Sequence, residues 1–192
     1  MKPEKNLNTE INPLLNKRWS PRSFNPLELN DGEISKLFEA IRWSPSAFNE
    51  QPWHFIYADR RDLAAFKNVY ECLSEGNRSW TVNASMLIIT FVKNAFERNG
   101  KSNRYAAHDL GGAMANMTIQ ALDMGLYVHQ MAGIQKDVIL AKFNVPEGWE
   151  PLTMAAVGHL GSPELLDEKL RSGEESEQIR HALPDIHSMN KW

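Results

Sequence analysis

The sequence predicts a single domain in which helices and strands alternate, and three observations lead to this prediction. The chain has 192 residues, enough for one hydrophobic core. Its composition, 42% hydrophobic and 23% charged, is typical of a globular protein rather than of a disordered or collagen-like chain. Segments with apolar residues at helical spacing alternate with short β-branched and aromatic segments, and no Gly/Ser-rich linker separates them. We therefore expect one domain over residues 1–192.

The first half of the chain contains two expected helices and two expected strands. In order, we expect a capped turn at 21–25, a helix at 31–43, a loop at 44–52, a strand at 53–58, a helix at 61–73 and a strand at 84–92. Asp31 is the expected N-cap of the first helix. Prolines at both ends of the loop, Pro45 and Pro52, exclude a regular helix there.

The second half is dominated by one long helix. In order, we expect a helix at 105–126, a strand at 127–131, a helix at 136–143, a strand at 152–160 and a charged final stretch at 163–192. The long helix is apolar on two faces, so that it must be covered on both, either centrally in the domain or by another subunit. The final stretch is either a disordered tail or a docking segment, and its regularly spaced apolar residues favour docking, with another chain as one candidate surface.

Charge and sequence pattern exclude several classes of partner. Lys and Arg number 21 against 24 Asp and Glu, a net charge of −3, so the chain has no overall positive field for nucleic acid or anionic lipid. The longest apolar run, 86–92, is far shorter than the ~20 residues of a membrane-spanning helix. The N-terminal residues are polar and Cys72 is the single cysteine. We therefore expect a cytoplasmic protein without a secretory leader, a disulfide, a membrane partner or a nucleic-acid partner.

Metal and P-loop chemistry are weakly indicated. The six histidines form no His-x-x-x-His pair, and His108-Asp109 is an isolated dyad for which a capping or packing role is favoured over a metal site. Residues 95–102 satisfy a relaxed P-loop spelling and follow a predicted strand, which leaves open a nucleotide phosphatase that uses Lys101. Phe96 and the anionic Glu97 argue against it, because a phosphate cradle needs small residues whose N–H groups converge.

Arginine and amide side chains indicate a second kind of site. The guanidinium groups of Arg18, Arg22 and Arg180 suit a dianionic phosphate or a carboxylate, although each could also lie on a solvated surface. The amides of Asn49 and Gln51 suit the polar edge of a flat heterocycle, or else satisfy the backbone of their own loop.

Two motifs resemble those of the nitroreductase family of FMN-dependent oxidoreductases. Residues 18–24, Arg-Trp-Ser-Pro-Arg-Ser-Phe, resemble that family's Arg-x-Ser-x-Arg/Lys-x-Phe signature. Residues 44–55, which begin Ser-Pro-Ser-Ala-Phe-Asn-Glu-Gln-Pro-Trp, resemble its highly specific Ser-Pro-Ser-x-x-Asn-x-Gln-Pro-Trp loop. Further matches follow in the family's order through nearly the whole chain, at Asn77, 109–113, 125–126, Gly133, 158–161, Arg180 and Trp192.

The resemblance implies an α+β fold with a central, mostly antiparallel sheet flanked by helices. It implies an intertwined homodimer with two FMN molecules at the subunit interface and with exchanged C-terminal arms, here about 163–192. The expected FMN-binding residues are Arg18, Trp19, Ser20, Arg22, Pro45, Ser46, Ala47, Asn49, Gln51, Asn77, Ala132, Gly133 and Arg180.

Particular roles follow from the same resemblance. Arg18, Ser20 and Arg180 would hold the phosphate and ribityl chain, and Arg22 the pyrimidine edge or the phosphate side. Pro45, Ser46 and Asn49 would reach FMN from the partner subunit, and Asn77 would contact the pyrimidine. The backbone of Ala132 and Gly133 would lie near flavin N5, where the chemistry takes place without a catalytic side chain.

The implied reaction is a ping-pong oxidoreduction. NADH or NADPH would pass hydride to flavin N5 and then be replaced by a flat electron-poor acceptor such as a nitroaromatic or a quinone. A noncatalytic flavin-binding or sensing protein, or a specialised dehalogenating or flavin-fragmenting member, remains an alternative.

Three positions depart from the family pattern. Trp80 stands where many relatives have a Lys near the flavin N1/O2 edge, Gln178 stands where a second cation is common, and Ala132 replaces an acidic residue of some members. These departures bear on the redox potential and the individual contacts more than on FMN binding.

Overall fold

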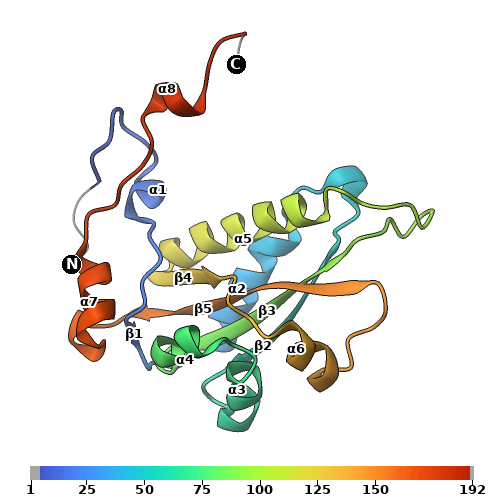
Figure 1. Ribbon diagram of the computed structural model, residues 1–192, viewed down its shortest axis with the longest axis horizontal. Coiled ribbons are helices and arrows are strands. Elements are labelled where there is room, and N and C mark those ends of the chain that lie inside the picture. The colour runs from blue at the N-terminus through green and yellow to red at the C-terminus, as the bar shows by residue number, and fades with distance from the viewer. Residues whose placement is uncertain (1–4, 191–192) are drawn as a thin grey trace.

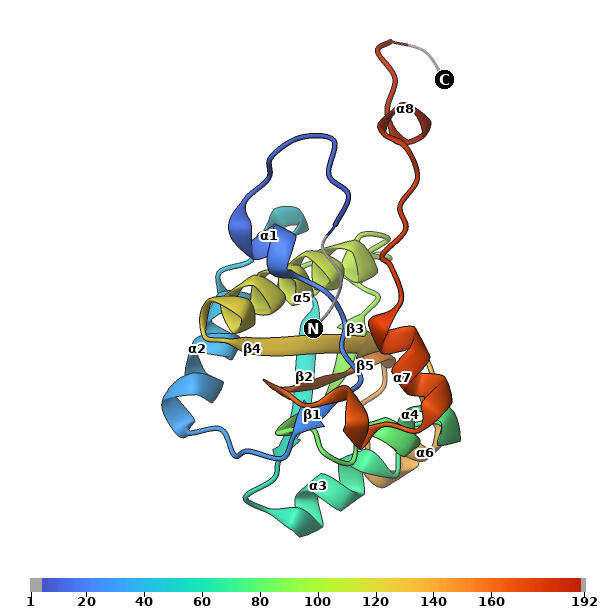
Figure 2. The ribbon, with the colours of Figure 1, turned by 90° about the vertical axis from the view of Figure 1, so that its left-hand side faces the viewer.

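An antiparallel sheet covered by helices on both faces forms the centre of the molecule (Figures 1 and 2). The computed structural model describes residues 5–190. The strands are β1 (Phe24–Asn25), β2 (Trp53–Asp59), β3 (Met86–Lys93), β4 (Leu126–Met131) and β5 (Trp149–Leu160). β5 is central: β3 pairs with one edge and β4 with the other, β2 pairs with β3, and β1 pairs with the end of β5. Every pairing is antiparallel, which confirms the expected α+β fold.

Two hydrophobic clusters, one on each face of the sheet, form the core. One face carries α3 (Leu63–Tyr70), α4 (Glu75–Thr81) and α6 (Lys136–Lys142), and the other carries α2 (Asp31–Arg42) and α5 (Ala106–Asp123). Side chains of β3 alternate between the clusters, with Leu87 and Ile89 in the first and Met86 and Ile88 in the second. This alternation is the two-residue period of a strand, and burial on both faces explains why the expected strand 84–92 has no polar side.

Several short helices were not expected from the sequence: α1 (Pro13–Lys17) and α4, and within the final stretch α7 (Glu168–Glu175) and α8 (Leu183–Ile186). α1 begins at the N-cap Asn12 and buries none of its residues. The expected helix 61–73 ends earlier, as α3, and a separate α4 follows. α4 buries only Trp80 and Thr81, so that its sequence carries no apolar period from which a helix could be predicted.

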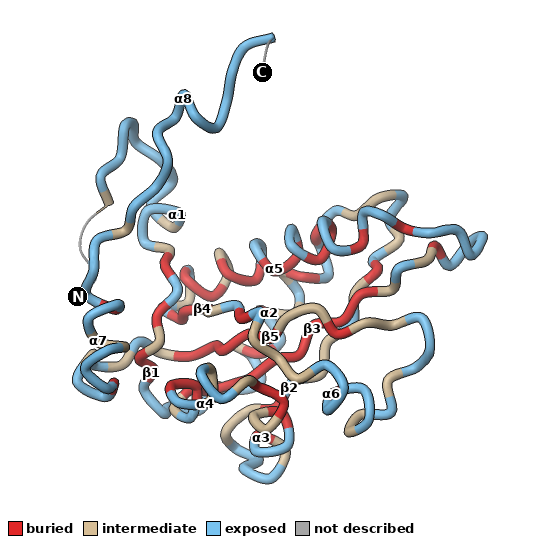
Figure 3. The backbone as a smooth tube through the Cα atoms, viewed as in Figure 1, coloured by how far each residue is buried: buried red, intermediate tan, exposed pale blue. Residues whose placement is uncertain are grey.

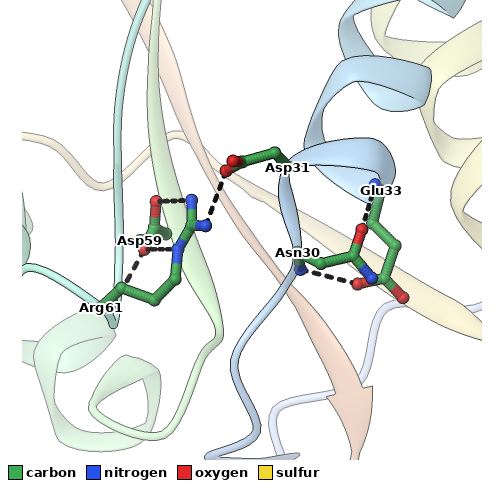
Figure 4. A network of polar contacts seen from close by, with 5 residues as sticks. All are labelled: Asn30, Asp31, Glu33, Asp59 and Arg61. Atoms are coloured by element: carbon green, nitrogen blue, oxygen red, sulfur yellow. Dashed lines mark hydrogen bonds and ion pairs between the residues drawn. The ribbon is translucent and has the colours of Figure 1, made fainter.

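The N-cap expected at Asp31 is wrong, because the neighbouring Asn30 has this role (Figure 4). The Asn30 side chain accepts from the Glu33 backbone at 3.0 Å, and the Glu33 carboxylate accepts from the Asn30 backbone at 2.9 Å. These reciprocal bonds form a capping box. Asp31 instead binds Arg61 at 2.6 Å, and Arg61 also binds Asp59, the last residue of β2. The Arg61 guanidinium lowers the pKa of Asp59.

The C-terminal stretch consists of two parts, one packed on the domain and one exposed. η2 (Pro163–Leu165) and α7 (Glu168–Glu175) lie against their own protomer, where Leu166 is buried. After Ser176 the chain leads away from the domain through α8 (Leu183–Ile186), and it is exposed from residue 179 onwards (Figure 3). Trp192, which the resemblance assigns to the arm, lies outside the described residues, as do the first four residues, on which the expected lack of a secretory leader partly rests.

Candidate functional site

A cavity of about 220 Å³ brings together five of the expected site residues. It is lined by Arg18, Trp19, Ser20, Arg22, Gly173, Glu174, Gln178 and Arg180. Arg18 follows α1, and Arg180 comes from the C-terminal stretch, 162 positions later in the chain. Burial lowers the pKa of Arg18, and the nearby charge of Arg180 lowers it further. Within residues 5–190, no carboxylate forms an ion pair with either arginine. Such a pair of guanidinium groups suits a dianion.

Glu174 of α7 fixes the backbone on the floor of this cavity. The side chain is 3% exposed. One carboxylate oxygen accepts from the Arg22 backbone N–H at 3.0 Å and from the Ser23 backbone N–H at 3.0 Å, and the other accepts from Arg22 at 3.1 Å. Hydrogen bonds to backbone N–H groups compensate the buried negative charge. The start of the arm is thereby tied to residues 22–23. No sequence pattern marks Glu174, because its partners lie about 150 positions away.

Asn77 and Gly133 form a second cluster. The Asn77 amide nitrogen donates to the Gly133 carbonyl oxygen at 3.0 Å, and the Ser74 backbone N–H donates to the same oxygen at 3.0 Å. A Cβ at position 133 would lie 2.6 Å from both Asn77 Nδ2 and Ser74 Oγ. Glycine therefore lets the loop after β4, including Ala132, approach α4 this closely without displacing these two side chains.

A buried aromatic group around Trp80 of α4 contacts the segment 18–22, which lines the 220 Å³ cavity, called below the cation cavity. Trp80 is 3% exposed, stacks on Phe24 with ring centroids 6.2 Å apart, and lies 4.5 Å from the His129 ring. Its indole is thus part of the core. The His129 ring contacts the Pro21 carbonyl oxygen through Nδ1 at 2.9 Å. Burial lowers the pKa of His129. The hydrogen bond with the Pro21 backbone raises this pKa in part, and the charge of Arg22 lowers it further. The neutral ring donates this hydrogen bond.

The expected loop residues Pro45, Ser46, Ala47, Asn49 and Gln51 lie together around the short helix η1 (Ala47–Asn49). Phe48, Asn49 and Gln51 adopt left-handed backbone angles, with φ between 51° and 58°. Such angles are costly for residues other than glycine. Ser46 Oγ accepts from the Gln51 backbone N–H at 2.9 Å, and the Gln51 amide donates to the Asn49 carbonyl oxygen at 3.1 Å. The Gln51 side chain thus bonds its own loop, and its expected contact with FMN stays a prediction.

Two residues of α5 hold this loop in place. The Asp109 carboxylate, 5% exposed, accepts from the Ala47 backbone N–H at 3.0 Å. About two helical turns further on, the Asn116 amide donates to Ser44 Oγ at 2.7 Å. The His108-Asp109 dyad was expected to cap or pack: Asp109 does not cap α5, whose N-cap Tyr105 makes no side-chain capping hydrogen bond, but it binds the packed loop. Its specific role, as the acceptor of the Ala47 N–H, was not predicted from the sequence.

The relaxed P-loop segment is a hairpin that packs against the same loop. Ala95 and Ser102 pair across it, and the Phe96 N–H donates to the Lys101 carbonyl oxygen at 2.8 Å. Lys101 is exposed and precedes α5 by several residues, so that it does not lie at a helix N-terminus. The Arg98 guanidinium lies 4.2 Å from the Phe48 ring centre. The segment thus lacks the strand-to-helix geometry of a phosphate loop.

The described part of the chain shows neither a candidate metal site nor a candidate membrane-spanning helix. Residues 5–190 contain no group of three or more His, Cys, Asp or Glu side chains able to hold a metal ion. In the same range, no helix combines the length and apolar character needed to cross a bilayer.

The loop and the backbone segments that line the cation cavity, at residues 18–22 and in α7, lie at opposite ends of α5 (Figure 1). Asp109 holds the loop at the N-terminal end, whereas Lys17, the neighbour of Arg18, lies with its Nζ 3.5 Å from the Leu122 carbonyl oxygen at the other end. Asp109 and Leu122 are about 20 Å apart along the helix. One protomer therefore does not bring all the expected FMN-binding residues to one place.

The chain is similar to known proteins in both sequence and structure. A solved structure described as an oxidoreductase containing FMN superimposes with a TM-score of 0.91 and 29% identity, over 98% of this chain and 96% of that one. A 15.4 kDa protein of Mycolicibacterium smegmatis is 34% identical over 135 residues, 70% of this chain and 88% of that protein. An oxygen-insensitive NADPH nitroreductase of Helicobacter acinonychis is 35% identical over 77 residues, 40% of this chain and 35% of that protein. Residues 15–159 match the model of the nitroreductase family, and the chain therefore belongs to that family.

Proposed function

We propose that the protein is an FMN-dependent oxidoreductase that takes electrons from NADH or NADPH and delivers them to flat, electron-poor acceptors such as nitroaromatics or quinones. The observation that carries this proposal is the cavity in which Arg18 and Arg180 lie together, neither of them ion-paired with a carboxylate of residues 5–190. The FMN named for the 29% identical structure and the NADPH nitroreductase activity named for the Helicobacter relative support it.

The residues present fit FMN. Arg18 and Arg180 supply guanidinium groups for its phosphate, with the hydroxyl of Ser20 in the same cavity. Asn77 and the backbone of Ala132-Gly133 supply amide groups for the polar edge of a flat ring. FMN, when bound, supplies the hydride and electron transfer, so that the chain needs no nucleophile or metal of its own.

Arg22 is the cation that we assign to the pyrimidine side of the site. Trp80 carries an uncharged indole, which is buried in the core, so position 80 contributes no cation to the site. Arg22 lines the cavity, and its charge reaches His129, which packs on Trp80. A fixed guanidinium there favours negative charge on the bound ring, as preorganised cations do in other active sites. Arg22 would thus replace the cation that many relatives carry at position 80.

The functional unit is a homodimer in which the two halves of each site come from different chains. Gly111, Gly112 and Ala115 form an exposed strip on α5. A Cβ added at either glycine would meet no atom within 4 Å, so the protomer itself does not require glycine there. A two-fold axis across this strip would place the Ser46–Asn49 loop of one chain beside the cation cavity of the other.

The C-terminal arm fits the same dimer. Its exposed apolar side chains, among them Ile179 at 81% and Met189 at 93% exposure, have no cover in the protomer. We assign their cover to the partner subunit.

The visible absorption spectrum of the purified protein tests the function, followed by anaerobic addition of NADH, then of NADPH, then of a nitroaromatic. The expected result is a flavin spectrum that bleaches with a reduced nicotinamide and returns with the acceptor. Flavin that never bleaches would indicate a noncatalytic flavin-binding protein. A colourless protein that takes up no FMN would refute the proposal.

A further inference from the structure

The described residues before α1, 5–12, which we call the lead, and the C-terminal arm enclose a second cavity, of about 470 Å³, beside the cation cavity. Residues 5–8, Ile11 and Leu15 line it from one side, and residues 177–182 from the other. Arg18, Gln178 and Arg180 line both cavities. The lead, which none of the motifs above includes, thus reaches the place proposed for the FMN phosphate.

Lys5 is the residue of the lead that carries charge into this place. Its Nζ donates to the Leu15 and Arg18 carbonyl oxygens, each at 2.7 Å. An ammonium group has three N–H donors, so one remains for another acceptor. The hydrogen bond to the Arg18 carbonyl fixes the ammonium beside the backbone of the arginine that lines both cavities.

Lys5, Arg18 and Arg180 act on one another as a cluster of like charges. Burial lowers the pKa of Lys5, and the charges of Arg18 and then Arg180 lower it further. Glu177 also lines the larger cavity, but among residues 5–190 no carboxylate forms an ion pair with any of the three cations. Repulsion of this kind is relieved when an anion binds between the cations.

A phosphate monoester is an anion that matches three cations. It carries between about −1.5 and −2 charges at pH 7 and offers three acceptor oxygens. We infer that Lys5 is a third cation of the phosphate site, beside Arg18 and Arg180, and that the lead closes over the phosphate of FMN. This inference rests on the proposed function.

A purely structural role for Lys5 makes a different prediction. The Leu15 and Arg18 carbonyls lie at the C-terminal end of α1, so Lys5 also caps that helix. Loss of the cap would weaken every ligand of the site alike. Loss of a phosphate contact would weaken FMN but spare riboflavin, which has the same ring and ribityl chain and no phosphate.

Flavin release from the as-purified holoprotein separates the two roles. Holoprotein is diluted, free flavin is followed by fluorescence, and the measurement is repeated after exchange of FMN for riboflavin. Lys5→Met is expected to raise the FMN dissociation constant about tenfold, the effect of one charge-assisted hydrogen bond, and to leave that of riboflavin within about twofold. The control Asn12→Ala removes the N-cap of α1, a 2.9 Å bond to the Leu14 N–H, without removing a charge. It should retain FMN.

Rescue from the arm supplies the second readout. Gln178 lines both cavities, so Lys5→Met combined with Gln178→Lys returns a cation to the same space and should recover most of the FMN affinity. Equal losses of FMN and riboflavin, or a loss that Asn12→Ala reproduces and Gln178→Lys does not repair, would overturn the assignment of Lys5 alone. Wild-type protein that binds no FMN would defeat the proposed function and this inference with it.

Discussion

Replacement of Gly112 by leucine tests the proposed dimer directly. Gly112 lies in the exposed strip of α5, and a Cβ there meets no atom within 4 Å. Within the protomer, Gly112→Leu should therefore be harmless, and removal of a helical glycine should stabilise α5 by about 0.8 kcal/mol. The strip is apolar and small, which suits the close approach of a second helix.

In the dimer the same substitution is costly. A side chain forced into a packed interface costs about 1–3 kcal/mol, and two-fold symmetry inserts it twice, which gives about 2–6 kcal/mol per dimer. A loss of 2 kcal/mol already raises the dimer dissociation constant roughly 30-fold. Because the loop of each chain would then leave the partner's cavity, FMN content should fall in parallel.

Sedimentation equilibrium over a range of protein concentrations measures the dissociation constant, and the ratio of flavin to protein absorbance measures FMN content. Ala64→Leu, at an exposed position of α3, is the matched control and should change neither. A Gly112→Leu protein that remains dimeric with full FMN would refute the placement of the interface on α5. So would a wild-type monomer that holds FMN.

Four further substitutions follow from the contacts of the site. Gly133→Ala places a methyl group 2.6 Å from Asn77 Nδ2 and should lower both FMN occupancy and the free energy of unfolding, by about 1–3 kcal/mol in urea; Gly76→Ala, with no atom within 4 Å, should not destabilise the fold. Asp109→Ala leaves the Ala47 N–H without its acceptor and should cost about 1–3 kcal/mol together with FMN, whereas Asp109→Asn keeps an acceptor and should lose less. Glu174→Gln removes the charge that two backbone N–H groups share and should speed proteolysis of the arm, measured by mass spectrometry; an unchanged cleavage rate would contradict its anchoring role. Burial keeps the pKa of His129 in the folded protein below its ordinary 6.5, so that on acidification the unfolded chain takes up this proton before the folded one. The contribution of His129 to the free energy of unfolding should therefore be complete above about pH 6.5 and decrease as the pH falls below it. In His129→Gln this part of the pH dependence should vanish from urea unfolding curves.

Periodicity predicted the elements that bury a continuous apolar face. Ile34, Leu37 and Ile41 recur at helical spacing and are all buried in α2. The short helices α1 and α4 were not predicted, because α1 buries none of its residues and α4 buries only its last two. Their positions are set by tertiary contacts, such as those of Trp80 with Phe24 and His129, which no local pattern encodes.

Part of the candidate site was predicted from the sequence, by motif resemblance rather than by periodicity. Motif resemblance predicted Arg18, Asn77, Gly133 and Arg180 as site residues, and the structure brings Arg18 to Arg180 and Asn77 to Gly133, although these residues are far apart in sequence. It did not identify Asp109 or Glu174 as anchors of the site, nor Lys5 as a neighbour of the arginines. Each of these side chains acts on backbone groups remote in sequence. A partner of that kind leaves no trace in residue type, since every residue offers the same N–H and C=O groups.

The separation of the loop from the cation cavity by the length of α5 has a consequence for genetics. In the proposed dimer, a chain defective in its loop, such as Asn49→Ala, and a chain defective in its cavity, such as Arg18→Ala, damage opposite halves of the sites. When the two variants are mixed and allowed to exchange subunits, each mixed dimer regains one intact site and carries one doubly damaged site. Random pairing restores about a quarter of all sites. Two inactive alleles would thus complement each other in one cell, whereas two alleles damaged in the same half would not.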